Sequence, residues 1–131
     1  MSEKFIIEIE EVAERDGRYK KEAYLFIYEA LQYTVEKLGK TELPTEQRHI
    51  CGRDLLYGIS EFAMDQLGPL TRSVFTHWGV VETRDFGEIV FNLVNSNLMS
   101  KTEEDNIEDF IGVYEFADEF DWKKRRENFK R

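Results

Sequence analysis

The sequence predicts a mainly α fold, a compact bundle of about five helices with an acidic C-terminal loop or hairpin. Apolar residues recur at spacings of three and four, which places them on one face of a helix. Glycine and proline fall between these stretches, where helices end and begin. The chain has 131 residues, 41% of them hydrophobic, which suffices for one packed core. We therefore expect one helical domain over residues 1–122 and a basic tail over residues 123–131.

The first expected helix follows Ser2, whose side chain can cap it, and ends at Gly17. A second helix is expected over residues 19–38, with Gly39 as its stop. This second helix carries apolar residues on two sides, so we expect neighbouring elements on both. The apolar stripe of the first helix consists of Phe5, Ile6, Ile9, Val12 and Ala13.

A connector leads to a third helix over residues 53–67. Gly68 and Pro69 then mark the end of one helix and the start of the next, because glycine suits the residue after a helix and proline suits its first position. The fourth helix is expected over residues 69–78. Its inward residues are predicted to be Leu70, Val74, Phe75 and Trp78.

Thr83 is expected to cap a fifth helix over residues 84–97. Within it, Gly87 is interpreted as a position where a neighbouring element comes close. The inward face is predicted to hold Phe86, Ile89, Val90, Leu93 and Val94.

The helical pattern ends after residue 97. Residues 98–116 allow a hairpin, with arms at residues 98–99 and 110–114, or an ordered loop. The loop is favoured because three successive acids, at positions 103–105, are poor strand formers. Such a loop would lay aromatic and aliphatic side chains on the bundle, namely Phe110, Val113, Phe116, Phe120 and Trp122.

Charge and composition limit the classes of function. Net charge is −9, and no apolar run approaches the roughly 20 residues of a membrane span. The first residues lack the basic start and cleavage site of a signal peptide. Cys51 is the only cysteine, so no intramolecular disulfide can form. We expect a cytoplasmic protein without a membrane segment; the sequence leaves its oligomeric state open.

Known metal and catalytic motifs fit poorly. A calcium loop starting at Asp105 would place Phe110 where the turn needs glycine and Ile107 where a ligand is needed. Nitrogen and sulfur donors are too few for a zinc site without a carboxylate, being only His49, Cys51 and His77. A looser magnesium site and a thiol paired with histidine remain alternatives. We expect no cofactor, no metal ligand and no catalytic residue, and the sequence favours a protein that is not an enzyme.

Nine acids lie within residues 98–122, and six bases follow in residues 123–131. We predict that the acids bind a basic protein partner, because carboxylates steer association and pair with Arg or Lys. A clasp between the tail and the acidic segment is the alternative use of these charges. The expected contact residues are Glu103, Glu104, Asp105, Glu108 and Asp109, flanked by Phe110.

The order of the fourth helix, turn, fifth helix and a hairpin also matches a winged helix. The alternative function is therefore a nucleic-acid-associated regulator that contacts phosphates through residues 123–131. Nucleic acid is disfavoured, because the exposed face of the fifth helix offers one base and one acid beside an acidic segment. That face consists of Arg84, Glu88, Asn92, Asn95 and Ser96.

Residues 48–120 resemble a family of small bacterial proteins of unknown function. The strings that carry the resemblance are "GRDLL", "LGPL", "HWG", "DFGEIVFNLV" and "SKTEEDNIEDF". The resemblance implies a bacterial origin but no activity, so it assigns no catalytic residue. It also implies that Cys51 stands where such proteins favour a small residue such as serine, which argues against a catalytic thiol.

Overall fold

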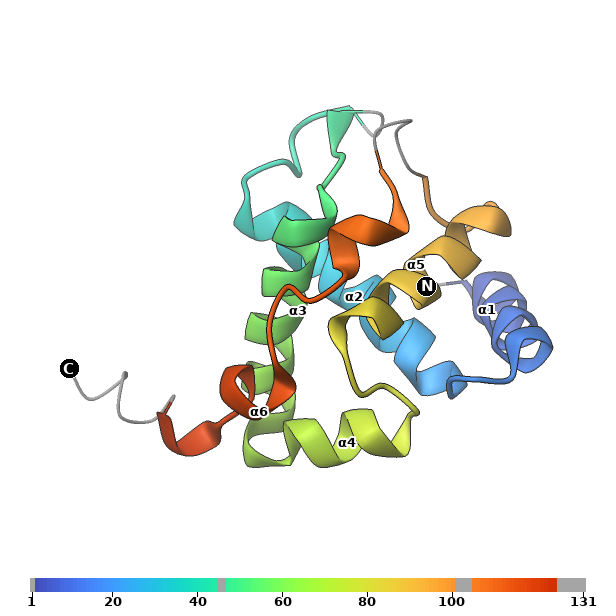
Figure 1. Cartoon of the computed structure of the whole chain (residues 1–131). Helices are drawn as coiled ribbons and strands as arrows, with labels where there is room; N and C mark the ends of the chain where they lie inside the picture. The colour runs from blue at the N-terminus through green and yellow to red at the C-terminus, as the bar shows by residue number, and fades with distance from the viewer. Residues whose placement is uncertain (1, 45–46, 101–104, 125–131) are drawn as a thin grey trace.

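The computed structural model describes residues 2–44, 47–100 and 105–124. These residues form helices and loops without a strand, which confirms the mainly α bundle (Figure 1). Helices α1 to α5 correspond to the five that the sequence predicts. The elements are α1 (Glu3–Asp16), α2 (Lys21–Lys37), α3 (Gly52–Leu67), the 3-10 helix η2 (Gly68–Leu70), α4 (Thr71–His77), α5 (Thr83–Asn95), the 3-10 helix η3 (Ile107–Phe110) and the single turn α6 (Phe116–Glu119).

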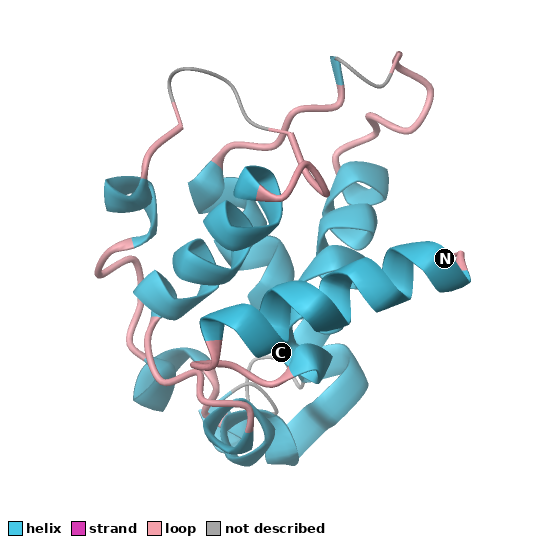
Figure 2. Ribbon diagram, turned by 90° about the vertical axis from the view of Figure 1, so that its right-hand side faces the viewer, coloured by secondary structure: helices cyan, strands magenta, loops and turns pink. Residues whose placement is uncertain are grey.

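Helix α2 is the central element, as its two apolar sides predict. It packs against α1, α3 and α5. Figure 2 views the molecule from the side of α1 and shows α1 lying across the front of the bundle. The buried side of α2 consists of Ala23, Tyr24, Phe26, Ile27, Ala30 and Thr34. In the described part of the chain, no helix combines the length and the apolar character that crossing a membrane requires.

The ends of α1 follow the local chemistry of the sequence. Ser2 Oγ accepts a hydrogen bond from the backbone N–H of Phe5 at 3.2 Å, which satisfies one of the free donors at the start of the helix. Gly17 ends the helix in the left-handed region, at φ 76°, where glycine carries no steric penalty. Both expectations for this helix are confirmed.

The cap of α5 differs from the expectation. Glu82, not Thr83, is the capping residue, and it exchanges hydrogen bonds with Asp85 in a capping box. Thr83 occupies the first helical position and is 1% exposed. Its Oγ1 accepts a hydrogen bond from the backbone N–H of Val113 at 3.3 Å. The hydroxyl therefore holds the segment after η3 instead of the start of its own helix.

Phe75 of α4 lies at the centre of an aromatic cluster and is 1% exposed. Its ring contacts five others, those of Phe26, Trp78, Phe86, Phe116 and Phe120, at centroid distances between 5.2 and 6.0 Å. Two of these rings come from the C-terminal segment, so that segment completes the core. Ser60 Oγ also donates to Glu119 Oε2 at 2.5 Å, which ties α6 to α3.

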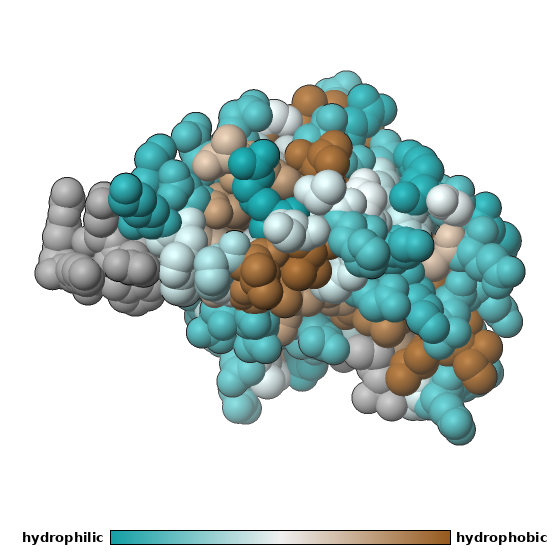
Figure 3. All heavy atoms as spheres, turned by 90° about the horizontal axis from the view of Figure 1, so that it is seen from below, coloured by the Kyte–Doolittle hydropathy of each residue, from teal (hydrophilic) through white to brown (hydrophobic). Residues whose placement is uncertain are grey.

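Leu70 corrects the predicted inward face of the fourth helix. It is 62% exposed because residues 68–70 form a separate 3-10 turn before α4 begins. A 3-10 turn has three residues per turn instead of 3.6, so the face expected from α-helical spacing rotates outward there. Figure 3 shows the lower surface of the molecule, with apolar side chains interrupted by hydrophilic ones.

Residues 98–100 and 105–115 are an ordered loop around η3, and the described residues there contain no strand. The hairpin alternative is therefore wrong for this part of the chain. Phe110 packs onto α5 at Gly87, where an added Cβ would lie 2.7 Å from both Cβ and Cγ of Phe110. The expected close approach at Gly87 is confirmed. On its other side the same ring meets Gly52 of α3, so two glycines hold it.

The contact between α2 and α3 depends on Gly58. A Cβ at this position would lie 1.9 Å from Thr34 Oγ1 and 2.9 Å from Thr34 Cβ. Alanine normally stabilises a helix interior by about 1 kcal/mol over glycine, but overpacking here costs more. We expect Gly58→Ala to lower the free energy of unfolding by about 1–3 kcal/mol, measured by urea denaturation.

The companion variant Thr34→Ala removes Oγ1 and Cγ2 but not the neighbouring Cβ. We expect the double variant with Gly58→Ala to recover part of the loss, as a coupling energy in a double-mutant cycle. A Gly58→Ala protein as stable as the wild type would contradict this account of the contact.

Candidate functional site

Two hollows lie side by side where the segment before α3 meets the segment that contains η3. Figure 1 shows these two segments at the upper end of the molecule. The first is a cavity of about 500 Å³, lined from α2, α5 and residues 48–52. The second is a wider groove of about 970 Å³, lined by residues 49–53 and by the segment around η3. His49 and Asp105 line both hollows, so their pair forms part of the wall between them.

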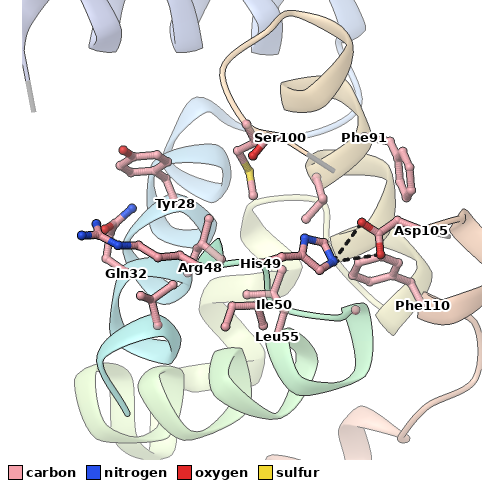
Figure 4. Close-up of a pocket in the computed structure, with 15 residues that line it drawn as sticks. Tyr28, Gln32, Arg48, His49, Ile50, Leu55, Phe91, Ser100, Asp105 and Phe110 are labelled. Carbon is pink, nitrogen blue, oxygen red and sulfur yellow. Dashed lines mark hydrogen bonds and ion pairs between the residues drawn. The ribbon is translucent and has the colours of Figure 1, made fainter. Parts of the chain in front are cut away.

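His49 and Asp105 lie 56 residues apart in the sequence and meet through their side chains (Figure 4). Nε2 of His49 lies 3.2 Å from Oδ1 and 3.1 Å from Oδ2 of Asp105. A carboxylate only accepts hydrogen bonds, so the imidazole N–H is the donor. Lys40 Nζ donates to the carbonyl oxygen of His49 at 2.8 Å and holds the same segment from the other side. This contact joins the connector before α3 to the segment before η3.

The six predicted contact residues fall into different environments. Glu103 and Glu104 lie outside the described residues. Asp105 turns toward His49, and its side chain is only 16% exposed. Glu108 and Asp109 are exposed on η3. The structure therefore brings two acids to the surface and uses a third in the wall between the two hollows.

The prediction that Phe110 belongs to the contact surface is wrong. It is 3% exposed and fills the space between α3 and α5, where its ring also meets Phe91 edge-on at 6.1 Å. A buried ring of this kind is unavailable to a partner protein. Its role is to attach η3, and the acids on it, to the bundle.

A capping box shapes the turn that carries these acids. Asn106 Oδ1 accepts from the backbone N–H of Glu108 at 2.8 Å, and Asp109 Oδ2 accepts from the backbone N–H of Asn106 at 3.2 Å. Asp109 thus combines an exposed carboxylate with a local structural contact. Glu108 contributes its backbone N–H to this turn, and its carboxylate is exposed.

The groove combines charge with apolar surface. Glu108 and Asp109 lie on one side, and Ile111, which is 46% exposed, follows them. Arg53 lies on the α3 side, with its guanidinium carbon 5.9 Å from the centre of the Tyr57 ring. Exposed large apolar side chains beside charges of both signs are typical of protein contact surfaces.

Further along the same segment lies a partly buried tyrosine, Tyr114. Its hydroxyl donates to the carbonyl oxygen of Leu56 at 2.8 Å, and its ring meets Tyr57 at 5.6 Å. Burial raises the pKa of Tyr114 well above that of an exposed tyrosine, since the charged phenolate loses hydration there. The side chain is therefore neutral near pH 7 and supports the α3 wall of the groove.

The three nitrogen and sulfur donors are not assembled into one site. Cys51 is exposed and lines the groove with His49. His77 ends α4, at the opposite end of the molecule (Figure 1). Among residues 2–44, 47–100 and 105–124, no group of three or more His, Cys, Asp or Glu could hold a metal ion.

The outer side of α5 makes contacts within the bundle. Arg84 Nε lies 3.3 Å from Glu88 Oε1, and Arg18 reaches the other oxygen of Glu88 at 3.4 Å. Asn92 Nδ2 donates to the Tyr24 hydroxyl at 2.9 Å. Burial raises the pKa of Tyr24 to about 12, so this hydroxyl keeps its proton at neutral pH. Arg84, Glu88 and Asn92, three residues of the α5 face that a DNA-binding protein would turn toward the bases, thus have intramolecular partners.

The start of the basic tail lies away from η3 (Figure 1). Lys124 Nζ lies 3.2 Å from Asp118 Oδ1, and both side chains are largely exposed. An exposed ion pair of this kind contributes little to stability. The expected clasp between the tail and the acids at 103–109 falls largely on residues 101–104 and 125–131, which lie outside the described residues.

The partnership of His49 with Asp105 and the cavity beside it were not predicted from the sequence. No local pattern indicates either, because the residues involved come from four separate segments. Comparison with protein families, with curated proteins and with solved structures finds no match for this chain.

Proposed function

We propose that this protein is a non-enzymatic interaction module that binds a basic segment of a partner protein in the groove between α3 and η3. The observation that carries the proposal is the pairing of exposed acids with exposed apolar surface: Glu108 and Asp109 stand beside Ile111. Carboxylates attract and orient a basic segment, while an apolar side chain supplies contact area.

The groove is also held in shape before a partner arrives. Phe110 anchors the segment between Gly52 and Gly87, and the Asn106–Asp109 capping box defines its turn. Thr83 adds a hydrogen bond to Val113. A surface that is already ordered loses less conformational entropy on binding, which favours affinity.

The setting of the protein belongs to the same proposal. We place it in the cytoplasm because its one cysteine is exposed and unpaired, which suits a reducing compartment. A bacterial origin follows from the resemblance of residues 48–120 and is proposed with it.

The proposal predicts the effect of neutralising Glu108 together with Glu103 and Glu104, the two predicted contact acids that lie outside the described residues. We expect the triple variant Glu103→Gln, Glu104→Gln and Glu108→Gln to weaken binding of a basic peptide by about tenfold, since each surface pair contributes about 0.5 kcal/mol and three together about 1.5 kcal/mol. Asp105 and Asp109 stay unchanged because they bond to His49 and to the η3 turn. The measurement is fluorescence anisotropy with peptides chosen from an array of Lys- and Arg-rich sequences, at low and high salt.

The matched control removes three exposed acids elsewhere, by Glu11→Gln, Glu14→Gln and Glu29→Gln on α1 and α2. It changes the net charge equally and should leave peptide affinity near that of the wild type. Equal losses in the two triple variants would mean attraction to overall charge only. Unchanged peptide binding by the Glu103, Glu104 and Glu108 triple variant would contradict the proposal that these acids bind the partner.

A nucleic-acid-associated regulator of winged-helix type is the second candidate, favoured by the six bases in residues 123–131. The same assay with a labelled DNA duplex separates the two functions. Salt-dependent duplex binding that is tighter than any peptide binding, and that is lost on deleting residues 123–131, would replace the first proposal with this one.

A further inference from the structure

The cavity beside the His49–Asp105 pair is a separate feature from the groove. Its volume of about 500 Å³ lies within the roughly 300–1,000 Å³ of small-molecule sites. Most of its wall is apolar, including Leu31, Val35, Ile50, Leu55, Val90 and Met99.

Arg48 gives this apolar cavity a positive group. Its side chain lines the cavity, and Figure 4 shows the guanidinium on the side of Tyr28 and Gln32. Nε donates to the carbonyl oxygen of Leu43 at 2.7 Å, which uses one of the five N–H donors of the group. In the described part of the chain, no carboxylate lies within 4 Å of its nitrogens, whereas Arg18 and Arg84 both pair with acids.

The acid in the same cavity is already engaged. Asp105 accepts from His49 Nε2 in the part of the wall that also borders the groove. Its charge is therefore offset locally by a donor, and among the described residues no carboxylate pairs with the remaining guanidinium N–H groups of Arg48. An arginine with free donors at the edge of an apolar cavity favours an anionic oxygen group.

We infer that this cavity binds a small amphiphile with one anionic head, a carboxylate or sulfonate on an aliphatic or aromatic body. The head contacts Arg48, and the body packs against the apolar wall from α2 and α5. A single guanidinium matches a single negative charge. Ligands with several phosphates fit poorly, because the protein carries a net charge of −9 that repels them.

The test measures the preference for the head group. Anilinonaphthalene sulfonate serves as a fluorescent probe, and it is displaced by octanoate, by octanol or by octylammonium, which share one chain length. We expect octanoate to displace the probe at least about tenfold more effectively than either analogue, as a charge-assisted hydrogen bond allows. Absence of saturable probe binding, or equal displacement by all three, would overturn the inference.

Variants assign the preference to one side chain. Arg48→Gln should abolish the preference for octanoate, and Arg48→Lys, which keeps the charge, should retain part of it. The matched control Arg53→Gln removes a charge from the groove and should leave displacement unchanged. Each variant is first compared with the wild type by circular dichroism and thermal unfolding, so that a loss of fold is recognised.

A second variant tests the cavity itself. Val35→Phe keeps every polar group and fills space next to α5, so it should weaken octanoate and octanol alike, by about tenfold or more. Two outcomes would overturn the proposal. One is that Arg48→Gln keeps the full preference or loses no more of it than Arg53→Gln; the other is that Val35→Phe binds as the wild type does.

Discussion

Replacement of Phe75 by alanine is expected to lower the free energy of unfolding by about 3–5 kcal/mol, the usual cost of removing a buried aromatic side chain. The ring is 1% exposed and contacts rings from α2, α4, α5 and the C-terminal segment. Removing it leaves a cavity that four elements border. Since domains are stable by only about 5–15 kcal/mol, one substitution removes a large share of the total. Urea denaturation followed by circular dichroism measures the change.

Leu70→Ala is the matched control for Phe75. Leu70 lies five residues earlier and is 62% exposed, so its replacement should change stability by no more than about 0.5 kcal/mol. Comparable losses in the two variants would mean that the aromatic cluster is not the centre of the core.

Phe110→Ala is expected to have an effect of similar size, about 3–5 kcal/mol, but with a local component. The ring holds η3 between α3 and α5, and both helices present glycine to it. Without the ring, residues 105–113 are held by smaller contacts, such as Ile107 at Gly87, the His49–Asp105 pair and the Thr83–Val113 hydrogen bond. We expect hydrogen exchange in this segment to accelerate more than in α2, because local opening then costs less than global unfolding.

The control for this variant is Ile111→Ala, one residue further along and 46% exposed. It should leave both stability and hydrogen exchange near their wild-type values. If Phe110→Ala unfolds at the same urea concentration as the wild type, the ring is not the anchor that its burial indicates.

The helices and several of their ends could be predicted from the sequence because their causes are local. Ser2 caps the residue three positions later, and Gly17 ends the same helix. Gly68 and Pro69 lie in η2, which separates α3 from α4 where the pattern places a boundary. Apolar spacing likewise identified the buried faces of α2 and α5. Capping contacts of this kind join residues at most four positions apart, so a short stretch of sequence contains both partners.

The cap of α5 and the exposure of Leu70 show where local rules stop. Glu82 and Thr83 are both adjacent to the helix start, and residue preference favours threonine as the cap. The structure assigns the cap to Glu82 because the Thr83 hydroxyl is taken by Val113, 30 residues away. A competing long-range partner decided between two locally acceptable arrangements.

The candidate sites depended most on tertiary structure. The sequence by itself determined a single helical bundle, its net negative charge and the clustering of acids before a basic tail. Only the fold buried Phe110 between two glycines, turned Asp105 toward His49, and set Arg48 at the edge of a cavity lined by apolar side chains. Charge and apolar spacing are properties of neighbouring residues, whereas burial and pairing are settled by which distant segments pack together.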